Sequence, residues 1–174
     1  MMPSVLFVCT ANRFRSPLAA AIMNKILDEN AKSGADSWFF HSPDAWHIDS
    51  AGTWAVPGQP ALPIVSEAAQ KLGIDLSGHR SKRLNGEMLS KYDLILVMQA
   101  SHKESLQIEF PAFGDHIYLL SSVLERGSYD IVDSMEAENE VTDVIQDMYT
   151  LMQRGLRYIC VLATALHNQR NKVK

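Results

Sequence analysis

The chain has 174 residues, a length typical of one globular domain with a sizeable core. Hydrophobic residues make up 47% and charged residues 21%, a balance that excludes an intrinsically disordered chain. The net charge of −4 argues against wholesale binding to nucleic acid or to an anionic membrane, and two cysteines are too few for a disulfide framework.

A short apolar run, Val5–Val8, predicts a buried strand near the start of the chain. Further on, Ser16 and Pro17 are typical of a helix start, because Ser is a good N-cap and Pro fits the first helical position. We expect this helix to run from Pro17 to about Asn30.

The loop between this strand and this helix begins with Cys9 and ends with Arg15. A loop of this length directs backbone N–H groups at one spot, where these donors and the helix dipole favour an anion. Since the same field stabilises a thiolate, Cys9 at the base and Arg15 above it would combine an oxyanion site with an activated nucleophile. The alternatives are a small buried thiol at Cys9 and a surface ion-pair residue at Arg15.

The segment from Ala31 to Asp49 predicts a long loop or strand extension, with an insertion at about 31–47. We expect its aromatic residues to pack against the core, and an exposed aromatic patch for a partner is the alternative. These residues are Trp38, Phe39, Phe40 and Trp46.

The rest of the chain alternates short apolar runs with helical patterns. The expected elements are a strand near Trp46–Ile48, a turn at Ser50–Trp54, a helix over Ala61–Leu72 that stops at Gly73, a short helix near Asn85, a strand at Leu94–Met98, a helix from Ser101 to about Phe110 with a capping box from Glu104, a strand at Ile117–Leu120, and a long helix from Glu136 to about Leu166. We expect a break in the last helix at Gly155 and a frayed tail from Arg170.

Four short strands that alternate with helices predict a parallel sheet with helices on both faces, an α/β fold. In such sheets, ligands bind at the carboxyl ends of the strands. Because Cys9 lies at the carboxyl end of the first strand, the motif and the architecture indicate the same site.

The stretch Cys9–Pro17 resembles the phosphate-binding loop of the low-molecular-weight protein tyrosine phosphatases, and the similarity extends to Ser50–Thr53, Gly78–Ser81 and Leu94–Met98. The resemblance implies one domain over residues 1–174, with three layers and a four-stranded parallel sheet of order 2-1-3-4. It also implies a metal-independent, cofactor-free phosphomonoesterase. Its substrates would be phosphotyrosine proteins or small aryl phosphates, with inorganic phosphate as the product.

The resemblance makes Cys9 the nucleophile, Arg15 the phosphate-binding side chain and Trp54 an aromatic wall beside the substrate. The residues it assigns to the phosphate-binding loop and its support are Thr10, Ala11, Asn12, Arg13, Phe14, Ser16, Ser50 and His79. The residues alone leave open that Trp54 packs within its loop and that His79 is a solvated turn residue.

One carboxyl group near the loop can protonate the leaving oxygen and then activate water. In the family, this acid opens an Asp-Pro pair just before the last helix. The matching residue is Asp133, followed here by Ser134, and Asp130 is the reserve candidate. The alternative is a structural role, in which Asp133 caps the final helix.

Several residues depart from the family pattern. Arg13 and Phe14 replace an aliphatic residue and a second Cys, which removes the usual disulfide partner of the nucleophile, and Cys160 lies on a predicted helix. Arg13 adds positive charge that favours more anionic substrates. Met135 and Glu136 replace the family's paired Tyr.

Other functions are compatible with parts of this pattern. A phosphate- or phosphoprotein-binding module without turnover is the alternative from another class. Arsenate reductases reuse the loop but need further cysteines, and phosphoarginine phosphatases usually have Thr at the position of Arg13. A nucleotide-binding domain lacks support, because neither G-x-G-x-x-G nor a P-loop motif appears.

The start of the sequence lacks the pattern of a signal peptide, and no apolar run reaches membrane-spanning length. We therefore expect a protein of the reducing cytoplasm with no membrane partner.

Overall fold

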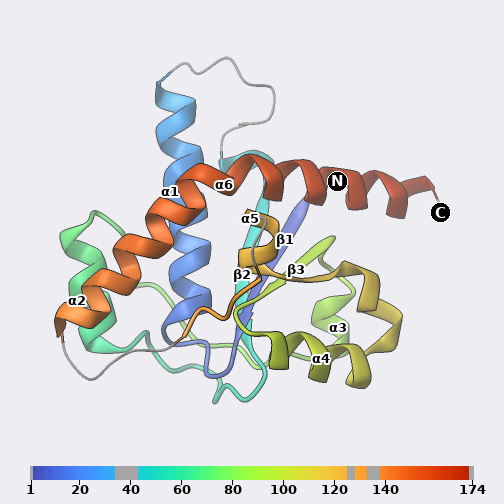
Figure 1. The fold of residues 1–174 in the computed structure, drawn as a ribbon, viewed down its shortest axis with the longest axis horizontal. Helices are drawn as coiled ribbons and strands as arrows, with labels where there is room; N and C mark the ends of the chain where they lie inside the picture. Colours follow the sequence, from blue (N-terminus) through green and yellow to red (C-terminus); the bar gives the residue numbers. More distant parts are fainter. Residues whose placement is uncertain (1, 34–42, 125–127, 133–137, 173–174) are drawn as a thin grey trace.

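In a computed structural model of the chain, which describes residues 2–33, 43–124, 128–132 and 138–172, a sheet of four parallel strands forms the centre (Figure 1). The strands are β1 (Ser4–Cys9), β2 (His47–Gly52), β3 (Leu94–Val97) and β4 (Ile117–Leu119). Their order is β2-β1-β3-β4, and Val8 lies opposite both Ala51 and Val97. The predicted fold class and strand order are confirmed.

Helices cover both faces of the sheet. They are α1 (Arg15–Lys32), α2 (Pro63–Lys71), α3 (Gly86–Leu89), α4 (Ala100–Glu109), α5 (Leu120–Leu124) and α6 (Glu138–Lys172), with 3-10 turns at Pro43–Ala45 and Pro111–His116. Side chains alternate between the faces of a strand, so Phe7 belongs to the core cluster that α1, α2, α5 and α6 share, whereas Leu6 belongs to the cluster under α3 and α4. Both faces of β1 and β3 are therefore buried, as their unbroken apolar runs predict.

Two predicted helix caps are wrong. Helix α1 begins at Arg15, after Phe14, and the hydroxyl of Ser16 contacts the sulfur of Cys9 instead of capping the helix. Helix α4 begins at Ala100 and has no side-chain cap from its own N-terminal sequence. A carboxylate oxygen of Asp130 accepts from the Ala100 N–H at 2.7 Å, so a residue distant in sequence bonds to the first N–H of this helix.

Two expected interruptions are also wrong. Ser50–Gly52, predicted as a turn, continues β2 and pairs with Phe7–Cys9. Gly155 does not break α6 but lets α5 approach it, because a Cβ atom there would lie 2.5 Å from Cδ2 of Leu124. Helix α5 itself was not predicted.

Other local signals are confirmed. The side chain of Asn85 accepts from the Met88 N–H and caps α3, and Gly73 ends α2 with a φ of 69°. Trp46 is buried in the core. The remaining aromatic residues of the predicted insertion, Trp38, Phe39 and Phe40, lie outside the described residues.

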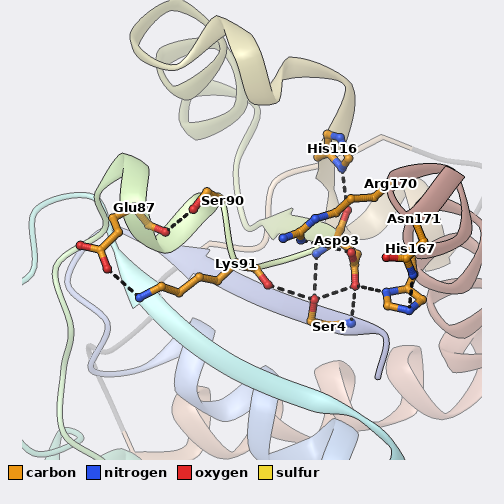
Figure 2. Close-up of polar contacts among 9 residues, drawn as sticks. All are labelled: Ser4, Glu87, Ser90, Lys91, Asp93, His116, His167, Arg170 and Asn171. Carbon is orange, nitrogen blue, oxygen red and sulfur yellow. Dashed lines mark hydrogen bonds and ion pairs between the residues drawn. The ribbon is translucent and has the colours of Figure 1, made fainter. Parts of the chain in front are cut away.

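The end of α6 is fixed to the sheet by Asp93, whose carboxyl group lies at the amino ends of the strands, opposite the Cys9 end (Figure 2). This residue is 2% exposed. Its Oδ2 accepts from the N–H and hydroxyl of Ser4 at 2.9 and 2.7 Å and from Nδ1 of His167 at 3.0 Å, while Arg170 donates to Oδ1 at 3.3 Å. These contacts explain why α6 stays helical beyond Arg170, where we expected fraying.

None of the helices in the described parts of the chain combines the length and the apolar character needed to cross a bilayer.

The Asp93 cluster gives a stability prediction. Asp93→Ala leaves the buried donors of Ser4 and His167 without their acceptor, so we expect a loss of about 3 kcal/mol in the free energy of unfolding, measured by urea denaturation. Asp28→Ala is the matched control, because the exposed Asp28–Lys32 pair is worth at most about 1 kcal/mol. Equal losses in the two variants would show that the cluster does not hold α6.

Candidate active site

The loop from Cys9 to Arg15 connects the carboxyl end of β1 to the start of α1. Its carbonyl groups are held by the segment that follows β2, because the N–H groups of Thr53, Trp54 and Leu62 donate to the oxygens of Cys9, Thr10 and Arg13, each at 3.0 Å. The main chain of a neighbouring segment therefore fixes the shape of this loop at several points along its length.

Gly52 allows this close approach. A Cβ atom at this position would lie 2.5 Å from the Thr10 oxygen and 2.9 Å from the Asn12 nitrogen, so any side chain would displace the loop. Sequence reasoning matched Gly52 to the family only as part of a longer stretch. The signal that could have identified it is a glycine at the end of a strand beside the loop.

Asn12 is the fully buried centre of the loop. Its φ of 56° lies in the left-handed region, which Asn tolerates better than most residues. Its side-chain nitrogen donates to the hydroxyl oxygens of Ser16 and Ser50, each at 2.9 Å, and its Oδ1 accepts from the Lys82 N–H at 2.8 Å. The structure thus brings Asn12 and Ser16 together with Ser50, which is distant from both in sequence.

The Cys9 sulfur lies at the base of the loop and is nearly inaccessible, with the residue 2% exposed. The Asn12 N–H donates to it at 3.3 Å, and the Ser16 oxygen lies 3.0 Å away. The single hydroxyl hydrogen of Ser16 has two acceptors in reach, the sulfur and the Ala51 oxygen at 3.1 Å. This hydrogen can turn to the sulfur when the thiol loses its proton.

His79 supports the loop from outside. Its Nε2 lies 2.7 Å from the Asn12 carbonyl oxygen. Because a carbonyl only accepts, Nε2 carries the hydrogen. Burial lowers the pKa of His79, although the hydrogen bond to Asn12 opposes this shift, so the neutral ring is the state that fits here.

Arg15 is 3% exposed and donates from Nη1 to the Ile131 oxygen at 2.9 Å. The Ile131 N–H donates in turn to the Met98 oxygen at 2.8 Å. These contacts hold the segment that leads to Asp133 beside the loop. Asp133 itself lies outside the described residues, and Asp130 is engaged at the start of α4.

Sequence reasoning missed His102, a buried residue of α4. Its Nε2 lies 3.0 Å from the Thr10 hydroxyl. Burial and the positive charge of Arg15 lower the pKa of His102, and Asp130 partly opposes them. A polar residue just after the third strand, at the same edge of the sheet as Cys9, is the signal that could have indicated it.

The remaining predicted residues differ in exposure. Phe14 is buried in the core, Ala11 is exposed, and Trp54 is 75% exposed, which does not fit packing within its loop. The guanidinium of Arg83 lies 5.8 Å from the centre of the Trp54 ring.

Cys9 and Cys160 are both free thiols. Burial in α6 raises the pKa of Cys160 to about 12, which leaves its thiol protonated and unreactive. Within the described residues, no group of three or more His, Cys, Asp or Glu side chains could hold a metal ion.

Comparison with known proteins places this site in a family. The model of the low molecular weight phosphotyrosine protein phosphatases matches residues 4–171. The chain belongs to this family. It is a cysteine-based phosphatase, in a family that acts on phosphorylated proteins or other phosphate substrates.

Three relatives illustrate the range of this phosphatase family. A probable low molecular weight protein-tyrosine-phosphatase, EpsP, of Ralstonia nicotianae is 30% identical over 90% of this chain and 92% of its own length. A protein-arginine-phosphatase of Bacillus subtilis is 26% identical over 88% and 96%. The crystal structure of a low molecular weight protein tyrosine phosphatase from T. tengcongensis superposes with a TM-score of 0.74, at 32% identity, over 88% and 97%.

The neutral state of His79 predicts a dependence of stability on pH. Because its pKa is lower in the folded chain than the usual 6.5, the unfolded chain binds more protons in the interval between the two values. The contribution of His79 to the free energy of unfolding is therefore complete above pH 6.5 and decreases as the pH falls below that value. We expect the free energy of unfolding to fall between about pH 7.5 and about pH 5.5.

The measurement is urea denaturation at both pH values. His79→Gln keeps an N–H donor for the Asn12 oxygen but does not titrate, so its loss of stability in acid should be smaller. His79→Ala removes the donor as well and should be less stable than wild type at the higher pH. An acid loss in His79→Gln as large as that of wild type would contradict this account.

Proposed function

We propose that this chain is a protein tyrosine phosphatase that works through a cysteinyl-phosphate intermediate. In this proposal Cys9 is the nucleophile, Arg15 binds the phosphoryl oxygens and Asp133 is the general acid and base. The observation that carries the proposal is the sulfur of Cys9 at the base of a loop whose shape is fixed, with the Asn12 N–H and the Ser16 hydroxyl beside it.

In the first step, the Cys9 thiolate attacks phosphorus, a P–S bond forms and the P–O bond to the tyrosyl oxygen breaks. Asp133 gives its proton to the leaving oxygen. In the second step, Asp133 takes a proton from water, which attacks phosphorus and breaks the P–S bond. Inorganic phosphate and the thiolate are the products of this step, and Ser16 can donate its hydroxyl hydrogen to that thiolate.

Three features support phosphotyrosine as the substrate. Exposed Trp54 offers a ring face for an aryl group, and the EpsP relative is named as a probable tyrosine phosphatase. The Bacillus relative is named as an arginine phosphatase, which makes phosphoarginine the second candidate. Arg13 favours the first, because its charge would repel the guanidinium of phosphoarginine.

We also propose a cellular compartment and a class of substrate for this activity. A free thiolate at Cys9 needs a reducing compartment, so we place the activity in the cytoplasm. The net charge of −4 supports a protein or small-molecule phosphate substrate over a nucleic acid.

The nucleophile is tested by Cys9→Ser. We expect turnover of p-nitrophenyl phosphate without added metal to fall by at least about 10³-fold, because the serine hydroxyl is a far weaker nucleophile. Cys160→Ser is the matched control and should keep most of the wild-type rate, since that thiol is buried in α6. If the wild-type chain binds phosphate but turns over neither aryl phosphate nor phosphoarginine, it is a binding module and the proposed function is wrong.

The general acid is tested by Asp133→Asn with two leaving groups. We expect kcat/KM, which reports the first step alone, to fall about 100-fold for phenyl phosphate, a poor leaving group that needs the proton, and less than about 5-fold for p-nitrophenyl phosphate. Asp130→Asn keeps an oxygen acceptor for the Ala100 N–H, so it should change both rates by the same factor. If the larger loss for phenyl phosphate appears in Asp130→Asn instead of Asp133→Asn, Asp130 is the general acid.

A further inference from the structure

Positive charge is concentrated around the Cys9–Arg15 loop, although the chain as a whole carries a net charge of −4. Three segments, 10–16, 52–63 and 78–84, contain five Lys or Arg residues and no Asp or Glu. The five cations are Arg13, Arg15, Arg80, Lys82 and Arg83.

Main-chain contacts bring these segments to one place. The N–H groups of Trp54 and Leu62 bond the 52–63 segment to the loop. The Lys82 N–H donates to the Asn12 side chain, and Arg83 forms a bridge with Gly52, the neighbour of Cys9 across β1 and β2. The three segments therefore meet at the Cys9–Arg15 loop.

Only part of this charge is neutralised by the protein. Lys82 pairs with Asp49 at 2.6 Å. By contrast, Nε of Arg13 donates to the Pro60 carbonyl oxygen at 2.9 Å, and Arg83 lies over the Trp54 ring. Among the described residues, no carboxylate is within ion-pair distance of Arg13 or Arg83. Two cations beside the loop are thus left without an acidic partner.

Arg83 lies close enough to Cys9 to contact a residue that flanks the phosphorylated side chain. Cys9, Gly52 and Arg83 are neighbours across two strand spacings, which is about 10 Å. An extended peptide covers this distance in about three residues. A carboxylate two or three residues from a phosphorylated side chain at Cys9 can therefore reach Arg83, whose guanidinium lies 5.8 Å from the centre of the exposed Trp54 ring.

We propose that Arg13, Trp54 and Arg83 form a docking site for acidic residues that flank the phosphorylated side chain of a protein substrate. This inference rests on the proposed function, since it places the phosphate at Cys9. The ring of Trp54 contacts the substrate aryl group, and the two guanidinium groups pair with carboxylates of the same segment. Because exposed charges act over a Debye length of about 8 Å, the preference must weaken at high salt.

The experiment compares two phosphotyrosine peptides that differ only in flanking Glu or Gln residues. For the wild-type chain we expect kcat/KM about 10-fold higher for the Glu peptide at about 50 mM NaCl, and about 2-fold higher at about 500 mM. Arg83→Gln should reduce the low-salt preference to about 3-fold, and the Arg13→Gln/Arg83→Gln double variant should abolish it.

Arg157→Gln is the matched control. Arg157 is also an exposed Arg against an aromatic ring, 4.8 Å from that of Tyr158, but it lies on α6. It should keep the 10-fold preference of wild type. No preference in wild type, or the same loss in Arg157→Gln as in Arg83→Gln, would overturn the docking site.

A separate readout distinguishes this inference from the proposed function. If the wild-type chain does not hydrolyse p-nitrophenyl phosphate, the proposed function fails, and fluorescence anisotropy of the same two peptides then decides the docking site. Tighter binding of the Glu peptide that is lost in Arg83→Gln supports it. Equal affinities for the two peptides overturn it.

Discussion

The site depends on one buried side chain, that of Asn12. The loop that leads from β1 to α1 contains one residue in the left-handed region, and its buried polar atoms need partners. Asn12 is this residue and meets this need, because its amide group bonds to Ser16, Ser50 and the Lys82 N–H, and its own carbonyl accepts from His79. These partners come from three separate parts of the chain, so the loop acquires its shape only when these parts have folded together.

The sheet separates two kinds of polar cluster. At the amino ends of the strands, Asp93 is saturated with donors and anchors α6, a structural use of a buried charge. At the carboxyl ends, the Asn12 N–H and the Ser16 hydroxyl lie beside the Cys9 sulfur. The difference follows from strand polarity, because parallel strands bring loops and a helix N-terminus to one edge of the sheet.

The sequence was sufficient for the architecture but not for the contacts across it. Apolar runs and local stop signals such as Gly73 and Asn85 depend on near neighbours, and these predictions are confirmed. The predicted caps of α1 and α4 were wrong because tertiary contacts replace them. Ser16 bonds to Cys9 and Ala51, and Asp130 accepts from the Ala100 N–H. His102 was missed for the same reason, since its partner Thr10 is 92 positions away.

The buried groups around the loop support it without adding charge. His79 and His102 are both held toward the neutral form, chiefly by burial, so they act there as hydrogen-bonding groups. Arg15 is then a buried cation beside the neutral ring of His102. A protonated His102 would repel Arg15, so the neutral ring is the state that favours the hydrogen bond from Arg15 to the Ile131 oxygen.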